Sequence, residues 1–143
     1  MTVLMTGGPV GLEIANQDRK MISTPGCLKG QIQQVDLSVV DSDARTWTTV
    51  EDISAANFLN LYCVALEEVA ATESGMFRFV GNVDTITTGT PAVGATLEAA
   101  ATEELSATTV VSKCCAYVLE TGVDDELTRV FFDGINGFGF TET

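Results

Sequence analysis

The chain has 143 residues, of which 45% are hydrophobic and 19% are charged, and its 20 acidic residues against 7 basic ones give a net charge of -13. This length and composition are typical of one compact domain with a continuous core. The negative charge opposes binding to phosphate backbones and anionic membrane surfaces, so neither nucleic acid nor membrane is expected as a partner. The chain has no histidine, which removes the usual general base and the commonest metal ligand.

Targeting signals and cysteine motifs are absent from the sequence. No run approaches the roughly 20 apolar residues that a membrane-spanning helix needs. The N-terminal MTVLMTGGPVGLE lacks a basic region before an apolar run, so we expect a mature chain that begins near Met1, in the cytoplasm. Cys27, Cys63, Cys114 and Cys115 show no CxxC spacing and are predicted to be buried small apolar residues.

The first half of the chain predicts an arm followed by strands. Residues 1–28 contain Gly7-Gly8-Pro9 and lack firm strand periodicity, so they are predicted to form an extended arm that reaches a neighbour. KGQIQQVDL (29–37) is predicted to be the first barrel strand, and TWTTVED (46–52) a second one, with Trp47 as a core or an interface anchor. ISAANFLNL (53–61) is the stretch most compatible with a helix.

The second half is dominated by strand signals. YCVALEE (62–68), MFRFVGNV (76–83), KCCAYVLE (113–120) and TRVFFDG (128–134) are rich in β-branched and aromatic residues and predict strands. Residues 95–111 leave two alternatives. A helix from Thr96 to Leu105 would have an apolar stripe, whereas a hairpin would pair TLEAA with LSATT around Thr102 and Glu103. We favour the hairpin.

Two stretches share one plan. Residues 64–84 and 117–134 each contain an apolar strand, Leu-Glu, a polar turn and an arginine within an aromatic strand, which predicts two β-hairpins. Arg78 follows Glu67 by eleven positions and Arg129 follows Glu120 by nine, which suggests that the second turn is two residues shorter. Gly75 is the turn residue able to take a positive φ. The predicted fold class is mostly β, a small β-barrel or sandwich of hairpins with an extended N-terminal arm and at most one short helix.

The order of these elements resembles the small head decoration (capsid cement) proteins of tailed phages. The matching segments are 29–30, 64–67 with 73–75, 94–97 with 105–106, and 118–122 with 129–134. The resemblance covers roughly residues 29–137, which divides the chain into an arm (1–28), a barrel decoration domain (29–137) and a C-terminal tail (138–143). It implies a protein on the outside of the head, commonly a trimer at three-fold and quasi-three-fold positions, that clamps neighbouring major capsid proteins.

The function that follows from this resemblance is structural. We expect a virion protein on the outer capsid surface that cements the major capsid protein against internal DNA pressure and associates with itself as a homotrimer. No enzyme activity, catalytic residue, cofactor or metal is expected. The stretch 44–60 is longer and more apolar than the usual link of the family, and the tail INGFGFTET extends past its usual end, so either could contact a subunit or the capsid.

Two other readings of the sequence remain open besides a tail or head adaptor of the virion. The tail resembles the glycine-rich arm of trimeric all-β dUTPases at Gly134, Gly137, Phe138, Gly139 and Thr141, but Asp133 replaces the arginine of that arm, and the other dUTPase motifs are absent. Carboxylate groups could collect a calcium ion, although ordinary solvated turns explain them equally without a D-x-D-x-D-G loop. These groups are Asp41, Asp43, Glu51 and Asp52, and Asp124, Asp125 and Glu126.

Overall fold

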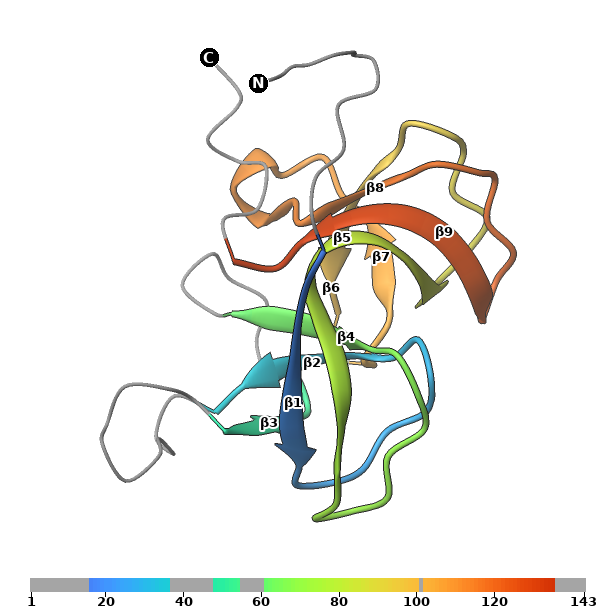
Figure 1. The fold of residues 1–143 in the computed structure, drawn as a ribbon. Helices are drawn as coiled ribbons and strands as arrows, with labels where there is room; N and C mark the ends of the chain where they lie inside the picture. The colour runs from blue at the N-terminus through green and yellow to red at the C-terminus, as the bar shows by residue number, and fades with distance from the viewer. Residues whose placement is uncertain (1–15, 37–47, 55–60, 101, 136–143) are drawn as a thin grey trace, which may run out of the picture.

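The computed structural model describes residues 16–36, 48–54, 61–100 and 102–135 (Figure 1). These residues form nine strands and one 3-10 turn, which confirms the predicted mostly β class. The elements are β1 (Gln17–Ser23), β2 (Ile32–Val35), β3 (Thr49–Glu51), β4 (Tyr62–Ala65), β5 (Ser74–Thr87), β6 (Thr96–Ala99), β7 (Leu105–Ala107), η1 (Val111–Lys113), β8 (Ala116–Val118) and β9 (Glu126–Asp133).

The first barrel, barrel 1, consists of β1, β3, β2, β4 and the first half of β5, hydrogen-bonded in that order. The ring closes because β1 pairs with β3 on one side and antiparallel with β5 on the other. Alternate residues of each strand point inward, among them the fully buried Met21 and Phe77. The prediction that 29–37 supplies the first barrel strand is therefore wrong, since β1 comes earlier and lies within the predicted arm.

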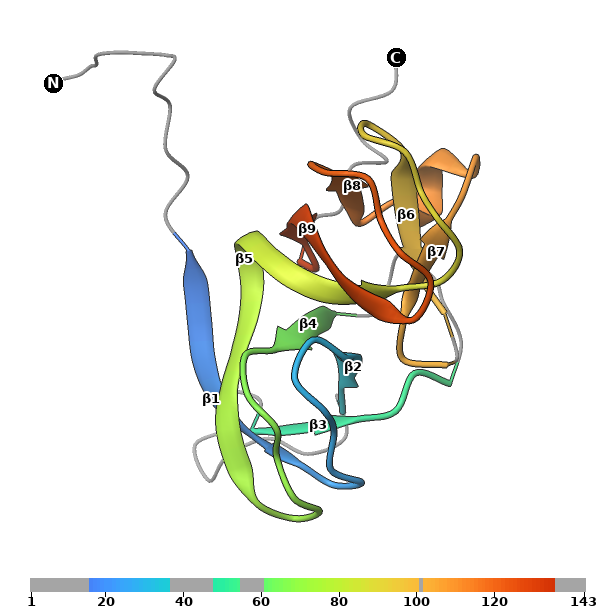
Figure 2. The same cartoon turned by 90° about the vertical axis from the view of Figure 1, so that its right-hand side faces the viewer.

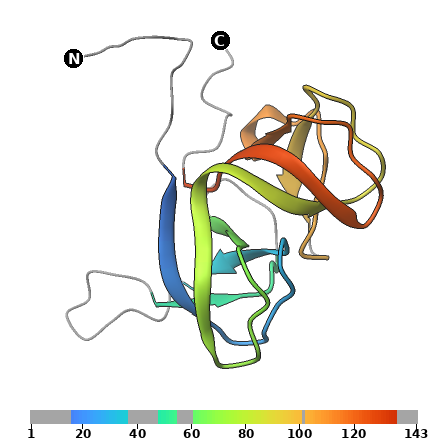
Figure 3. The same ribbon diagram turned by 45° about the vertical axis from the view of Figure 1, so that its right-hand side comes forward.

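Strand β5 continues into a second ring, barrel 2, which its second half forms with β7, β6, β8 and β9. β9 pairs antiparallel with β5 from Val80 to Thr87, and Thr87 also pairs with Leu105 of β7, so this ring closes as well. Figures 2 and 3 show the two barrels one above the other, with β5 passing through both. Of the two predicted architectures, barrel and sandwich, the structure is the barrel.

The junction between the barrels is a bend in β5 at Gly81. This residue has a φ of +134°, and a Cβ there would collide with the side chain of Asn16. The pairing of β1 with β5 shifts register between Gln17 and Asp18, at the same level as the bend. Arg78 Nη1 spans the bend and donates to the carbonyl oxygen of Asn82 at 2.7 Å. The positive φ of Gly81, the register shift of β1 and the hydrogen bond from Arg78 thus set the direction in which β5 enters barrel 2.

The hairpins β4–β5 and β8–β9 have the same length. In each, a backbone N–H donates to the side chain of the glutamate nine positions earlier: Met76 to Glu67, and Arg129 to Glu120. Met76 and Arg129 are therefore equivalent, and Arg78 lies two residues further along β5. The predicted two-residue difference in turn length is wrong, because it compared arginines that are not equivalent.

The two turns also share their backbone conformation. Thr72 and Asp125 occupy matching positions and take positive φ angles of 65° and 61°. The sequence placed that conformation at Gly75, whose φ is not positive. Gly75 is instead required by packing, since a Cβ there would collide with the side chain of Val69.

The remaining strands repeat in the same way. β2 pairs with β3 and β4 as β6 pairs with β7 and β8. After the first strand of each unit, Thr24 N–H donates to the Val50 oxygen at 3.0 Å, and Thr88 N–H donates to the Leu105 oxygen at 2.9 Å. The second half of β5 therefore takes the place in barrel 2 that β1 takes in barrel 1. The described chain is a tandem repeat of one five-stranded unit whose two copies share β5.

Both barrels bury polar side chains in their interiors. In barrel 1 the fully buried Gln33 accepts a hydrogen bond from Ser23 Oγ at 2.7 Å and donates to Asp52 Oδ1 at 3.1 Å and to the Gly26 oxygen at 3.4 Å. These partners satisfy an amide that would otherwise be costly to bury. The matching position of β6 in barrel 2 is the apolar Leu97. Barrel 2 has its own buried polar side chains, since Thr87 and Thr128 form a hydrogen bond of 2.9 Å between their hydroxyl groups and Thr85 is fully buried.

The four cysteines are buried and free, as predicted. Burial raises the pKa of the Cys63 and Cys115 thiols, so both stay protonated at neutral pH and are poor nucleophiles. Cys27, Cys63 and Cys115 act as small apolar residues in the two hydrophobic clusters of the barrels.

Other element predictions have mixed outcomes. The hairpin at 95–111 is confirmed, because β6 pairs antiparallel with β7 and Glu103 turns the chain with a φ of 62°. Residues 76–83 and 128–134 lie largely in β5 and β9, as expected. The predicted helix at 53–61 falls mostly on residues 55–60, which lie outside the described residues. Trp47, residues 1–15 of the arm and the tail 138–143 lie outside them too.

Candidate functional site

The described residues hold no group of three or more His, Cys, Asp or Glu side chains placed to hold a metal ion. Asp41 and Asp43, of the first predicted acidic group, lie outside the described residues. No helix in the described part of the chain is long and apolar enough to cross a membrane. Gly134, the only glycine of the dUTPase-like arm that the structure describes, has a packing role, because a Cβ there would collide with the backbone of Tyr62.

Most strand edges of the two barrels are paired. Each of the nine strands has hydrogen-bonded neighbours on both sides, and β5 has four. An exposed edge is what a partner uses to add a strand to a sheet. The pairing is partial for β1, which meets β3 only at Ile22 and Ser23, so the edge that β1 turns toward β3 is paired only at its end.

One outer face of barrel 2 carries an aromatic pair, of which Tyr117 is exposed and Phe131 half-buried. Tyr117 of β8 lies opposite Phe131 of β9, with ring centroids 5.7 Å apart. Leu119, which follows β8, and Ile135, which follows β9, are also exposed. Tyrosine and other large apolar side chains are enriched at protein interfaces, so this aromatic face is a candidate contact surface.

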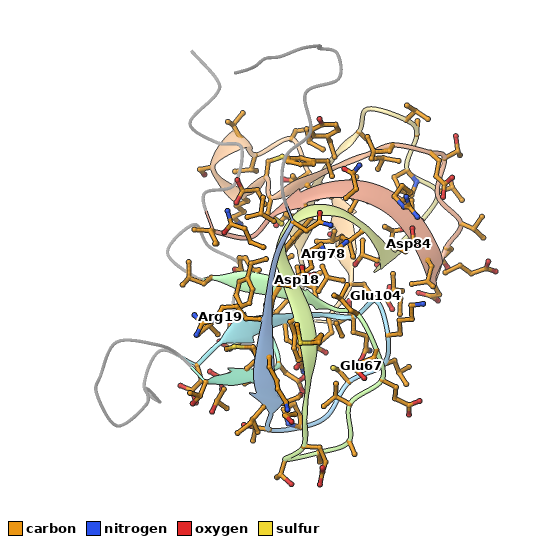
Figure 4. The ribbon with its side chains drawn as sticks, in the orientation of Figure 1. Asp18, Arg19, Glu67, Arg78, Asp84 and Glu104 are labelled. Carbon is orange, nitrogen blue, oxygen red and sulfur yellow. The ribbon has the colours of Figure 1, made fainter. Side chains whose placement is uncertain are left out.

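Two ion pairs link neighbouring strands to β5, one before the bend and one after it; Figure 4 labels Asp18, Arg78 and Asp84. Arg78 Nε lies 2.8 Å from Asp18 Oδ1, and Arg129 Nε lies 2.6 Å from Asp84 Oδ1; both pairs are bidentate. The hydrogen bond from Arg129 holds the pKa of Asp84 below its ordinary value, and the one to Asp18 raises the pKa of Arg78. These arginines are thus neutralised within the molecule rather than offered to a phosphate.

Replacing Arg78 with methionine should loosen the bend while keeping most of the apolar stem. The variant loses the bond to the Asn82 oxygen and the bidentate pair with Asp18, and we expect it to lower the free energy of unfolding by about 1–2 kcal/mol. Arg129→Met, which breaks only the more exposed pair with Asp84, should cost about 0.5 kcal/mol. Urea denaturation of the two variants checks the order; equal losses would contradict the role of Arg78 at the bend.

Three carboxylates gather where β5 ends. Thr88 Oγ1 donates to Glu104 Oε1 at 2.9 Å, and Gly89 N–H donates to Asp124 Oδ1 at 2.5 Å. Burial, opposed by the bond from Thr88 and reinforced by Asp125 and Asp124, raises the pKa of Glu104. We call this group, Thr88, Gly89, Glu104, Asp124 and Asp125, the β5-end surface. Asp124 and Asp125 were candidate site residues in the sequence, but Glu104 was not. The fold brings Glu104 to them from the β6–β7 turn.

Barrel 1 forms the same local backbone without these charges. The matching group lies where β1 ends and consists of Thr24, Thr49, Ala71 and Thr72, none of which ionises. The backbone bonds nevertheless correspond: Thr72 N–H donates to the Ser23 oxygen at 2.7 Å, just as Asp125 N–H donates to the Thr87 oxygen at 2.8 Å. Asp124 differs from its counterpart Ala71 because it accepts from the Gly89 N–H, a donor that barrel 1 lacks since Pro25 stands at the matching position.

Glu104→Gln is expected to stabilise the protein at pH 7. Glutamine can still accept from Thr88 but no longer repels Asp125 and Asp124, so a gain of about 0.5 kcal/mol is expected. Because the folded-state pKa of Glu104 is raised, the wild-type protein gains stability as the pH falls through that pKa toward the ordinary value of about 4.3. The difference in Tm should therefore shrink toward pH 4. A lower Tm for the variant at pH 7 would show that the carboxylate stabilises the fold.

Comparisons with known proteins show the fold. No protein-family model matches the chain, and no curated protein matches it. Among solved structures, the chain is similar to the head fiber gp8.5 N base of bacteriophage phi29, with a TM-score of 0.62 and 13% sequence identity. The match covers 83% of this chain and 95% of that one. The fold of the head fiber base and the fold described here are thus the same at low sequence identity.

Proposed function

We propose that this chain is a structural protein of a tailed-phage head that binds the outer capsid surface and cements neighbouring major capsid proteins. The observation that carries the proposal is the fold match to the head fiber base, which extends over 95% of that chain. The ordered segments that resemble decoration proteins support the same location in the virion. Attachment to a capsid requires only complementary surface area, which a pair of closed barrels can present without a catalytic group.

The charge of the chain fits an outer location. A net charge of -13 keeps particles apart in suspension and disfavours contact with the genome. No nucleic acid, membrane or cofactor takes part in this proposal. A second candidate function, suggested by the name of the similar structure, is a base that carries a fibre on the head; an image of the virion with density extending outward from the barrels would favour it.

Addition of the purified chain to capsids tests the proposal directly. Capsids of the phage that encodes the chain, purified from a mutant lacking it, should bind hundreds of copies and should withstand higher temperature before releasing DNA. Bovine serum albumin at the same concentration serves as the protein control. Absence of binding to mature and to immature capsids would overturn the proposal, and a few copies at one vertex would favour an adaptor instead.

Two further measurements address the partner and the enzyme alternative. A homotrimer predicts three times 15.1 kDa by light scattering, and Tyr117→Asp on the aromatic face should shift the mass toward the monomer. Ala71→Asp, on the distant β4–β5 turn, is the matched control and should leave the mass unchanged. Incubation with dUTP and magnesium should release no pyrophosphate above the rate in buffer alone. Specific release would support the alternative that the chain is a nucleotide hydrolase.

A further inference from the structure

The two barrels of one chain meet through an apolar face of barrel 1. Val64 of β4 and Ile32 of β2 pair with each other and are fully buried, and they lie in one hydrophobic cluster with the core of barrel 2. Leu66, which follows β4, packs against the same cluster. Cys63 and Ala65 belong instead to the cluster of barrel 1, so β4 turns alternate side chains toward the two barrels. Barrel 2 therefore covers a face of barrel 1 that would otherwise expose apolar area to water.

The aromatic face of barrel 2 occupies the corresponding positions. Tyr117 of β8 pairs with β6 and β9 just as Val64 of β4 pairs with β2 and β5. Leu119 corresponds to Leu66, because each precedes the glutamate that accepts from a backbone N–H of its own hairpin. Tyr117 and Leu119 are each 38% exposed, whereas Val64 is fully buried. The surface on which barrel 1 carries barrel 2 is thus repeated on barrel 2 and is exposed there.

Two glycines mark the same junction. Gly30 and Gly94 occupy matching positions before β2 and β6 and have nearly equal φ angles of +87° and +86°. A Cβ at Gly30 would collide with the side chain of Leu127 in barrel 2, whereas a Cβ at Gly94 would have no atom within 4 Å. Barrel 2 thus keeps the backbone that receives a neighbouring barrel and leaves space beside it.

β1 offers an open strand edge. The Met76 oxygen accepts from Leu66 N–H on β4, so Lys20, which pairs with Met76, turns its own N–H and C=O away from β5. β3 meets β1 only at Ile22 and Ser23, so no described strand pairs with Lys20 on that side. Ile22 and Met76 are 41% and 37% exposed beside this edge. An open edge with apolar side chains next to it is a typical contact surface.

The matching edge of β5 is covered by barrel 1. Ile86 N–H donates to the Gly30 oxygen at 2.9 Å, and the Asn82 oxygen accepts from Arg78 Nη1 at 2.7 Å. Both partners belong to barrel 1, and the second half of β5 takes the place in barrel 2 that β1 takes in barrel 1. The edge of β1 is open because no described barrel precedes it.

We propose that this junction is repeated between copies of the chain, so that β1 of one copy lies on the aromatic face of the next copy as the second half of β5 lies on barrel 1. A second copy is the partner because every copy carries both halves of the junction. The charges agree, since Lys20 forms no ion pair within the described residues and Glu120 adjoins Leu119 on the face. The contact joins unlike surfaces, so the copies associate head to tail and close into a ring. This inference rests on the homotrimer of the proposed function.

Mixing two variants tests the head-to-tail contact on the full chain. Leu119→Asp disrupts the face and Ile22→Asp disrupts the edge, so each variant alone should have the mass of one chain, 15.1 kDa, by light scattering at rising concentration. An equimolar mixture should form a complex of two chains, because the intact edge of the first variant can occupy the intact face of the second. Val123→Asp places the same charge at an exposed valine of the β8–β9 connection and should keep the mass of three chains.

The outcomes separate this inference from the binding of capsids. A mixture that stays monomeric while the unmodified chain is trimeric would show that like surfaces meet, and would overturn the head-to-tail contact. Trimers of either variant alone, or a monomeric unmodified chain, would overturn it as well. Circular dichroism checks that the variants keep their strands, and Leu119→Ser and Ile22→Ser replace any variant that does not. Failure of capsids to bind the unmodified chain overturns the proposed function independently of these masses.

Discussion

Replacing Gly134 with alanine is expected to lower the free energy of unfolding by about 3 kcal/mol, which corresponds to a fall in Tm of roughly 10 °C. Gly134 is held from two sides, since its N–H donates to the Phe79 oxygen at 2.8 Å and its oxygen accepts from Tyr62 N–H at 3.0 Å. A Cβ would collide with the backbone of Tyr62 and would lie 2.8 Å from the ring of Phe132. Backbone cannot move aside as a flexible side chain can, so the end of β9 must separate from β4.

Gly94→Ala is the matched control for this prediction. Gly94 has a φ of +86°, but a Cβ there would have no atom within 4 Å, so only backbone strain opposes the substitution. A cost of about 1 kcal/mol is expected. Thermal and urea unfolding of both variants provide the comparison. A loss at Gly134 no larger than the loss at Gly94 would show that the contact between β9 and β4 is dispensable.

Phe132→Ala is the substitution expected to cost most, about 4 kcal/mol. Phe132 is fully buried and lies in register with Gly81 on β5 and Ala116 on β8. Small residues on both sides leave nothing that can expand into the space, so a cavity persists. The same hydrophobic cluster contains Val64 of barrel 1, and the cavity therefore also weakens the contact between the barrels.

Phe131→Ala removes the same side chain from the next position, which faces outward. Phe131 is half-buried and contacts Tyr117 on the aromatic face, so a cost of about 1.5 kcal/mol is expected. Equilibrium urea denaturation should separate the two variants clearly. Similar costs at both positions would mean that β9 does not alternate between core and surface as its register indicates.

Much of the strand content was accessible from local pattern. The alternation in 76–83 and the β-branched run at 128–134 predicted parts of β5 and β9, because one face of each strand is buried and the other is not. The sequence pattern does not predict β1, because five of its seven residues are exposed and no apolar alternation marks it as a strand. Pairing with neighbouring strands holds it in the barrel. Its place in the barrel depends on β5, which lies far along the chain.

Comparing the two hairpins in the sequence alone does not show which of their residues are structurally equivalent. The two hairpins were visible in the sequence through their shared Leu-Glu, but aligning Arg78 with Arg129 introduced a difference in length that the backbone does not have. Hydrogen-bond register fixes the equivalence of Met76 with Arg129 instead. Exposed positions change identity freely, whereas the backbone pairing that defines the unit does not depend on them.

The candidate site was predicted least well, because its members come from separate connections. Asp124 and Asp125 adjoin in the chain, but Glu104 reaches them only through the pairing of β7 with β5. No local period or motif signals such a meeting.

The sequence alone determined the mostly β class, the two hairpins, the buried cysteines and the strongly acidic surface, since these follow from residue type and local alternation. The tertiary structure decided that the strands close into two barrels sharing β5, that every described strand has a paired neighbour on each side, and that carboxylates from separate connections gather at one end of barrel 2. Closure and convergence depend on pairing between distant segments, which short-range pattern does not encode.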